Sequence, residues 1–91
     1  MGVETRLFKS EERRSRQEVA TFLRASADKI DAGEVILGQG RNEVTLALPP
    51  QLILEVQVED EEKGVKGTQH SLEVELKWSD DMAESGPLEL R

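Results

Sequence analysis

The spacing of apolar residues predicts one amphipathic helix in the first third of the chain. After Ser15, apolar or small residues recur at intervals of three and four, which is the period of one helix face. They are Val19, Phe22, Leu23, Ser26, Ala27 and Ile30. Ser15 followed three residues later by Glu18 is a capping box, although Ser10 is a second candidate start. Gly33 is a typical helix terminator, so the helix is expected to end there.

Beyond Gly33 the period changes from 3.6 to two, which is the pattern of half-buried strands. Four alternating segments follow, and we expect each to place one apolar row toward a core. These segments are residues 34–37, 43–48, 52–59 and 71–78. The connections between them are "GQGRN" (38–42), "PPQ" (49–51) and the charged, glycine-containing run "EDEEKGVKGTQ" (59–69), which we expect to form a loop.

One helix followed by four strands predicts a two-layer α+β domain. We expect a single four-stranded antiparallel meander with the helix packed on one face. The β-tending residues of Val3–Lys9 are a candidate fifth strand. The expected organisation is an N-terminal arm or short strand (1–14), the domain itself (15–78) and a flexible C-terminal tail (79–91).

Alternation along the last strands predicts two different faces. Trp78 continues the apolar row, so we expect its ring on the helix side, near Ile30, Val35, Leu48 and Leu52, as a structural anchor. A partner-binding tryptophan at the sheet edge is the alternative. The opposite row is polar and mostly acidic, and we predict it as the interaction surface. Its members are Glu55, Glu59, Glu73, Glu75 and Lys77.

The charge of the chain favours protein partners over nucleic acid. Residues 1–48 carry eight basic and eight acidic residues, whereas residues 49–91 carry four basic and eleven acidic ones, which gives the net charge of −7. An acidic half repels phosphate backbones. Arg13, Arg14 and Arg16 lie among glutamates, so we expect a solvated helix start there, and a phosphate-contacting patch is the alternative. The chain lacks cysteine, an apolar signal segment and the roughly 18-residue apolar run of a membrane span, so we expect a cytoplasmic protein.

Candidate catalytic and metal-binding residues are few. His70 is the one histidine, and a small hydrolase or ligand-binding site using His70 with Glu73 or Glu75 is one hypothesis. The carboxylates of residues 59–62 are a candidate for weak divalent-cation binding, although they lack the spacing of an EF-hand loop. We expect no catalytic residues, cofactor or resident metal.

The chain resembles a known domain family in several stretches. They are "SRQEVATFLRASADKIDAGEVIL", "VTLALP", "LEVQVEDEE" and the terminal "SLEVELKW". Together they resemble the amphi-Trp domain, a small prokaryotic domain with an amphipathic last strand that ends in tryptophan. The resemblance covers about residues 15–78 and implies the fold. It implies no activity and no site residues.

These observations lead to one main functional hypothesis. We expect a non-catalytic, acidic accessory module that binds a protein partner, or another copy of itself, through its acidic sheet face or the edge of its last strand. An acidic surface adapted to a high-salt cytoplasm is the alternative origin of the charge.

The tryptophan can be tested directly. If Trp78 anchors the domain, Trp78→Ala lowers the free energy of unfolding by about 3–5 kcal/mol, as for other large core truncations. Denaturant unfolding of the variant measures this change. An unchanged unfolding midpoint contradicts the anchor and assigns the ring to a partner.

Overall fold

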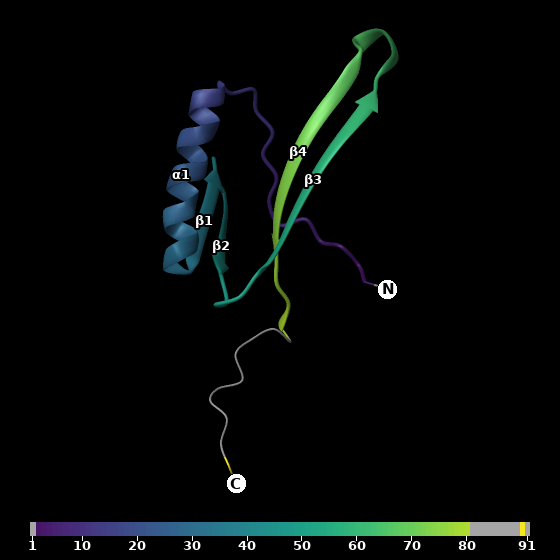
Figure 1. Cartoon of the computed structure of the whole chain (residues 1–91). Helices are drawn as coiled ribbons and strands as arrows, with labels where there is room; N and C mark the ends of the chain where they lie inside the picture. Colours follow the sequence, from purple (N-terminus) through teal and green to yellow (C-terminus); the bar gives the residue numbers. More distant parts are fainter. Residues whose placement is uncertain (1, 81–89, 91) are drawn as a thin grey trace. The chain divides into compact units, whose positions relative to one another are not determined.

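The computed structural model describes residues 2–80 and 90 (Figure 1). Its elements are the helix α1 (Arg16–Ala32), the strands β1 (Glu34–Gln39), β2 (Asn42–Ala47), β3 (Ile53–Glu62) and β4 (Thr68–Lys77), and the 3-10 turn η1 (Gly64–Lys66). The chain divides into a first unit, Met1–Leu48, and a second unit, Pro49–Arg91. The α+β class is confirmed.

Local signals set both ends of α1. The Ser15 hydroxyl accepts the Glu18 N–H at 3.0 Å, and the Glu18 carboxylate accepts the Ser15 N–H at 3.2 Å. This reciprocal capping box confirms Ser15 as the start, and Ser10 lies outside the helix. At the other end, Gly33 adopts a left-handed φ of 88°, and its N–H donates to the Lys29 and Ile30 carbonyls.

Strands β1 and β2 form an antiparallel hairpin in the first unit, and α1 lies beside β1 (Figure 1). Gly40, the first residue of the two-residue connection, has a φ of 59°, as a type II′ turn requires. The register pairs Val35 with Leu46 and Leu37 with Val44, and all four side chains are half-buried. The predicted apolar row is therefore present on this hairpin.

The small residue at the middle of the helix stripe is accommodated by a hydrogen bond. Ser26 is half-buried, and its hydroxyl donates to the Phe22 carbonyl one turn earlier at 2.7 Å. A hydroxyl without a partner at such a position would be costly. The bond allows a serine to occupy a position in the apolar stripe.

Two predictions about the sheet are wrong. Over the described residues, the strands form two separate two-stranded sheets, β1–β2 and β3–β4, and not one four-stranded meander. The connection between β2 and β3 contains Pro49 and Pro50, which have no N–H to extend a ladder. The Val3–Lys9 segment is not a fifth strand, because residues 2–14 have no regular secondary structure.

The second unit is a long antiparallel hairpin, and its loop is shorter than predicted. β3 extends to Glu62 and β4 begins at Thr68, so most of the expected 59–69 loop belongs to the strands. Gly64 and Gly67 have φ of 65° and 81°, and the Lys63 N–H donates to the Gly67 carbonyl at 2.8 Å. Two left-handed glycines therefore close the chain tightly, and the acidic residues before them continue the strand.

After β4, which ends at Lys77, the structure describes the chain continuously only as far as residue 80. Trp78 follows the last residue of β4 and is half-buried. Its predicted packing against the helix stays a prediction. The predicted flexible tail, residues 79–91, lies mostly outside the described residues.

Gly33→Ala tests the helix terminator. Gly33 is left-handed and its carbonyl accepts the Leu48 N–H at 2.9 Å, so an added Cβ strains the junction between α1 and the hairpin. We expect a loss of about 1–2 kcal/mol in the free energy of unfolding. Gly38→Ala is the matched control, because Gly38 has no positive φ and its added Cβ meets the Asn42 carbonyl at an ordinary 3.6 Å. Equal losses in the two variants would contradict the conformational argument.

Candidate protein-interaction surface

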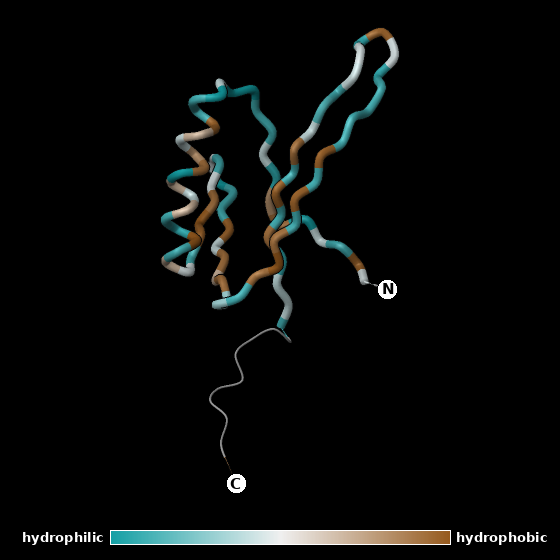
Figure 2. Tube along the Cα trace, viewed as in Figure 1, coloured by the Kyte–Doolittle hydropathy of each residue, from teal (hydrophilic) through white to brown (hydrophobic). Residues whose placement is uncertain are grey.

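The register of β3 with β4 separates the hairpin into two faces. Ile53 pairs with Lys77 and Glu62 with Thr68, and every pair between them joins residues of the same parity. Because successive side chains of a strand point to opposite sides, odd-numbered residues share one face and even-numbered residues the other. We call them the acidic face and the aliphatic face. Figure 2 shows hydrophobic positions on both strands, with hydrophilic positions toward the loop.

The acidic face contains every residue of the predicted interaction surface. Its charged side chains on the two strands are Glu55, Glu59, Glu61, Glu73, Glu75 and Lys77. Glu55 lies directly opposite Glu75, and a like-charged pair in this position destabilises a hairpin by roughly 0.2–1 kcal/mol. Lys77 offsets part of this cost, with its Nζ 3.3 Å from Glu55 Oε1. In the loop, Lys63 Nζ lies 3.0 Å from Glu61 Oε1. Two lysines against five carboxylates leave this face negative.

The aliphatic face has the opposite character. Its apolar residues form three cross-strand pairs, Leu54 with Leu76, Val56 with Val74 and Val58 with Leu72. Val56 and Val74 are 59% and 64% exposed. Nearer the loop this face becomes polar, since Asp60 pairs with His70 and Glu62 with Thr68.

The predicted site of His70 with Glu73 or Glu75 is not formed. His70 lies on the aliphatic face, whereas Glu73 and Glu75 lie on the acidic face. The partner of His70 is Asp60, whose Oδ1 is 2.6 Å from His70 Nδ1 across the strands. Sequence reasoning missed this pair because residue 60 was assigned to a loop.

The predicted cation site at residues 59–62 is not formed either. These residues belong to β3, so Glu59 and Glu61 point to one face and Asp60 and Glu62 to the other. Four carboxylates that alternate across a strand do not converge on one ion. Among residues 2–80 and 90, no group of three or more histidine, aspartate or glutamate side chains is arranged to hold a metal.

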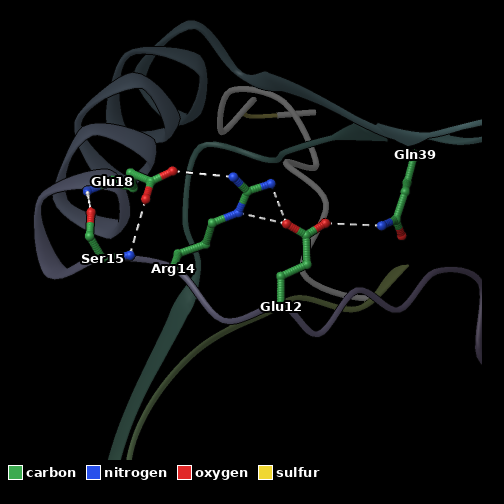
Figure 3. Close-up of polar contacts among 5 residues, drawn as sticks. All are labelled: Glu12, Arg14, Ser15, Glu18 and Gln39. Atoms are coloured by element: carbon green, nitrogen blue, oxygen red, sulfur yellow. Dashed lines mark hydrogen bonds and ion pairs between the residues drawn. The ribbon is translucent and has the colours of Figure 1, made fainter.

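A polar cluster ties the N-terminal arm to the rest of the first unit (Figure 3). Arg14 Nε donates to Glu12 Oε2 at 2.7 Å, and Arg14 Nη1 donates to Glu18 Oε2 at 3.2 Å. On its other side, Glu12 Oε1 accepts from Gln39 Nε2 at 3.0 Å. The cluster therefore connects the arm to both α1 and β1. The sequence held no signal for it, because Glu12 and Gln39 are 27 positions apart.

The surroundings of Arg14 and Glu18 move the pKa of each group away from neutrality. Hydrogen bonds to Glu12 and Glu18 raise the pKa of Arg14 above its ordinary value. The Ser15 backbone N–H, together with Arg14, lowers the pKa of Glu18. A group whose pKa moves away from neutrality is a poor proton donor or acceptor, so the cluster is suited to holding the arm and not to acid–base catalysis.

An open hollow of about 470 Å³ adjoins the cluster within the first unit. Phe8, Val19, Phe22 and Leu37 line its apolar part, and Glu12, Arg14 and Glu18 are among its polar lining residues. Because Arg14 is already bound to two carboxylates, the arginine that sequence analysis placed in a solvated helix start is not free for phosphate. In the part of the chain that the structure describes, no helix has the length and apolar character of a membrane span.

Comparison with known protein families identifies the chain. The model of the Amphi-Trp domain matches residues 1–91, so the chain belongs to the Amphi-Trp family. The resemblance inferred from residues 15–78 is confirmed, and the match extends over the whole chain. Comparisons with curated proteins and with solved structures gave no match.

The capping cluster predicts a pH dependence of the first helical turn. Because the folded-state pKa of Glu18 is lowered, its stabilising contribution is present above its ordinary pKa near 4.5 and is lost as the pH falls through the lowered value. We expect the Glu18 and Val19 amides to lose protection in this acidic range, which means that their exchange rates rise relative to those of an unstructured chain at the same pH. Glu18→Gln should remove this dependence and Glu11→Gln should keep it. Amide exchange by NMR measures both, and the same acid response in wild type and Glu18→Gln would contradict the assignment.

Proposed function

We propose that this member of the Amphi-Trp family is a non-catalytic interaction module that binds a basic protein segment through the acidic face of the β3–β4 hairpin. The observation that carries the proposal is the placement of five carboxylates and one lysine on a single face of two paired strands. A surface of one sign attracts partners of the other and speeds their encounter.

The pair of Glu55 and Glu75 lowers the stability of the hairpin, and nothing in its folding requires two carboxylates there. The two carboxylates are direct cross-strand neighbours, and an oppositely charged or neutral pair would stabilise the hairpin better. Glu73 opposite Gln57 adds a further carboxylate along the same row. Charge that is kept against local stability favours a binding role for the face, in which cations of a partner neutralise it.

The chemistry of the remaining groups supports a role in binding over catalysis. His70 contacts Asp60 on an open strand surface, with their side chains 74% and 63% exposed. Such an exposed pair lacks the enclosed, water-poor surroundings in which enzymes stabilise developing charge. Arg14 is held between two carboxylates in the first unit.

Two variants of equal charge change test the proposal. E55Q/E75Q removes two carboxylates from the acidic face, and the control D60N/E62Q removes two from the other face of the same hairpin. A ten-residue oligolysine peptide serves as the basic probe, and calorimetry at low and high salt measures its affinity. At about 0.5 kcal/mol for each exposed charge pair, E55Q/E75Q should weaken low-salt binding about fivefold, and the control much less.

The outcomes separate recognition from general solvation. Loss of affinity confined to E55Q/E75Q supports the acidic face as the binding surface, and its unfolding midpoint should stay the same or rise because the like-charged pair is gone. Equal loss in both variants would contradict the proposal and indicate that only net charge matters. The same two variants, used to capture partners from the native extract, then show which partners depend on this face.

A further inference from the structure

The outer edge of β4 has free backbone groups. The Lys63 N–H donates to the Gly67 carbonyl, so this pair is hydrogen-bonded, and hydrogen-bonded pairs recur at every second position of an antiparallel ladder. The odd-numbered residues of β4 therefore bond to β3, and the even-numbered residues direct their N–H and C=O groups outward. Within the described residues, β4 pairs with β3 alone. Such an edge is a template for another strand.

The two edges of the hairpin differ in their protection. β3 carries five acidic residues and no basic one, so two β3 strands gain no ion pair in any register. β4 carries two acidic residues, Glu73 and Glu75, together with Lys77. Charged residues are the usual guard against edge pairing. By this measure β3 is protected, and β4 is the edge that accepts a partner.

We propose that β4 pairs antiparallel with β4 of a second copy of this chain, across a two-fold axis that passes beside Glu75. The outward N–H and C=O groups of the two β4 strands meet only where even-numbered residues of one copy pair with even-numbered residues of the other. This pairing also places the aliphatic faces of both copies on the same side of the combined sheet. With the axis at Glu75, Glu73 lies opposite Lys77 of the other copy. By symmetry this oppositely charged pair occurs twice, whereas the two Glu75 residues at the axis form one like-charged pair.

Neighbouring registers are less favourable. An axis at Val74 sets Glu73 opposite Glu75 twice and gains no ion pair. An axis at Glu73 places Glu73 opposite Glu73 of the other copy, and Lys77 then faces Gln69, which carries no charge. An axis at Leu72 opposes no like charges, but it places His70 beside Val74 and leaves Trp78 without a partner strand. An axis at Leu76 sets Glu75 opposite Lys77 twice without opposing like charges, but it pairs only residues 75–77 of β4 with one another, whereas the axis at Glu75 pairs residues 73–77. Charge complementarity together with the length of paired strand therefore selects the register at Glu75.

The same register joins apolar residues across the interface. It sets Val74 opposite Leu76 and Leu72 opposite Trp78, each twice. Leu72 and Val74 are 69% and 64% exposed in the single chain, so both have surface to bury. Trp78 then lies within the interface, and tryptophan is enriched among the residues that dominate binding.

The size of the contact predicts a reversible dimer. Four outward-facing pairs supply about eight backbone hydrogen bonds. Seven paired residues give an interface below the roughly 1,200 Å² of stable complexes, so we expect a dissociation constant in the micromolar range. This dimer forms through the backbone of the strand edge, although Glu73, Glu75 and Lys77 of the acidic face set its register, and it does not rest on the proposed function.

Two matched proline variants test the edge. Val74→Pro removes an outward N–H from β4, and Val56→Pro removes the equivalent outward N–H from β3, the partner of Val74 in the register. Analytical ultracentrifugation measures association of the copies. The fluorescence of the one tryptophan, recorded over a series of protein concentrations, gives a second measure of dimer formation. We expect Val74→Pro to abolish the dimer and Val56→Pro to keep it, with circular dichroism confirming that both fold. A monomeric wild type, or a dimer that survives Val74→Pro, overturns the proposal.

Cysteine substitutions test the register without a proline. The chain has no cysteine, so E75C introduces one thiol per copy, which faces its own symmetry mate. Mild oxidation should cross-link E75C rapidly, because directly facing residues of a strand pair lie within disulfide range. E73C should cross-link slowly, because residue 73 faces residue 77 of the other copy and not residue 73. Faster cross-linking of E73C, or none in either variant, overturns the register at Glu75.

One further substitution separates the two proposals by the sign of its effect. Glu75→Gln removes the repulsive pair at the axis, so the dimer should tighten about twofold to fivefold. The same substitution removes a carboxylate from the acidic face, so oligolysine should bind less tightly. A weaker dimer contradicts the edge model alone, and unchanged oligolysine affinity contradicts the acidic-face model alone.

Discussion

The closure of the β3–β4 hairpin by Lys63 and Gly67 is the constraint on which the interaction surface depends. The backbone bond between these residues and the left-handed Gly64 and Gly67 fix which residue of β3 faces which residue of β4. Because side chains alternate at every residue, a slip of one position would move each carboxylate of one strand to the aliphatic side. The loop thus determines that Glu55 meets Glu75 and not Val74.

That register gives the hairpin two unequal faces and two unequal edges. Carboxylates in one row repel one another, and aliphatic side chains in the other row remain more than half exposed at Val56 and Val74. The edges follow the same division, since β3 has only acidic charges and β4 includes Lys77. A long hairpin of this kind gains little stability by itself, which favours its completion by other chains.

The sequence was most informative where the determining interaction is local. The capping box of Ser15 and Glu18 and the terminator Gly33 are encoded within a few residues. The end of α1 was therefore predicted, and its start was one of the two candidates, Ser10 and Ser15. The extension of β3 to Glu62 was missed because polar residues on both faces carry no hydropathy signal. The contact of Glu12 with Gln39 has no local signal at all. By contrast, the placement of His70 and Glu73 on opposite faces follows from the even and odd numbers of these residues in one strand. It could be predicted as soon as the strand was extended to residue 70.

The distribution of charge between the two units favours recognition over solvation as the origin of the acidity. Adaptation to a salt-rich solvent would make the whole surface acidic, yet residues 1–48 carry eight basic and eight acidic residues. In that unit Glu12 and Glu18 are both paired with Arg14. The imbalance of four basic against eleven acidic residues is confined to residues 49–91, where the five carboxylates of the acidic face share one lysine on the strands. A charge that is balanced in residues 1–48 and in excess in residues 49–91, where five of the eleven acidic residues share one hairpin face, has the distribution expected of a binding surface.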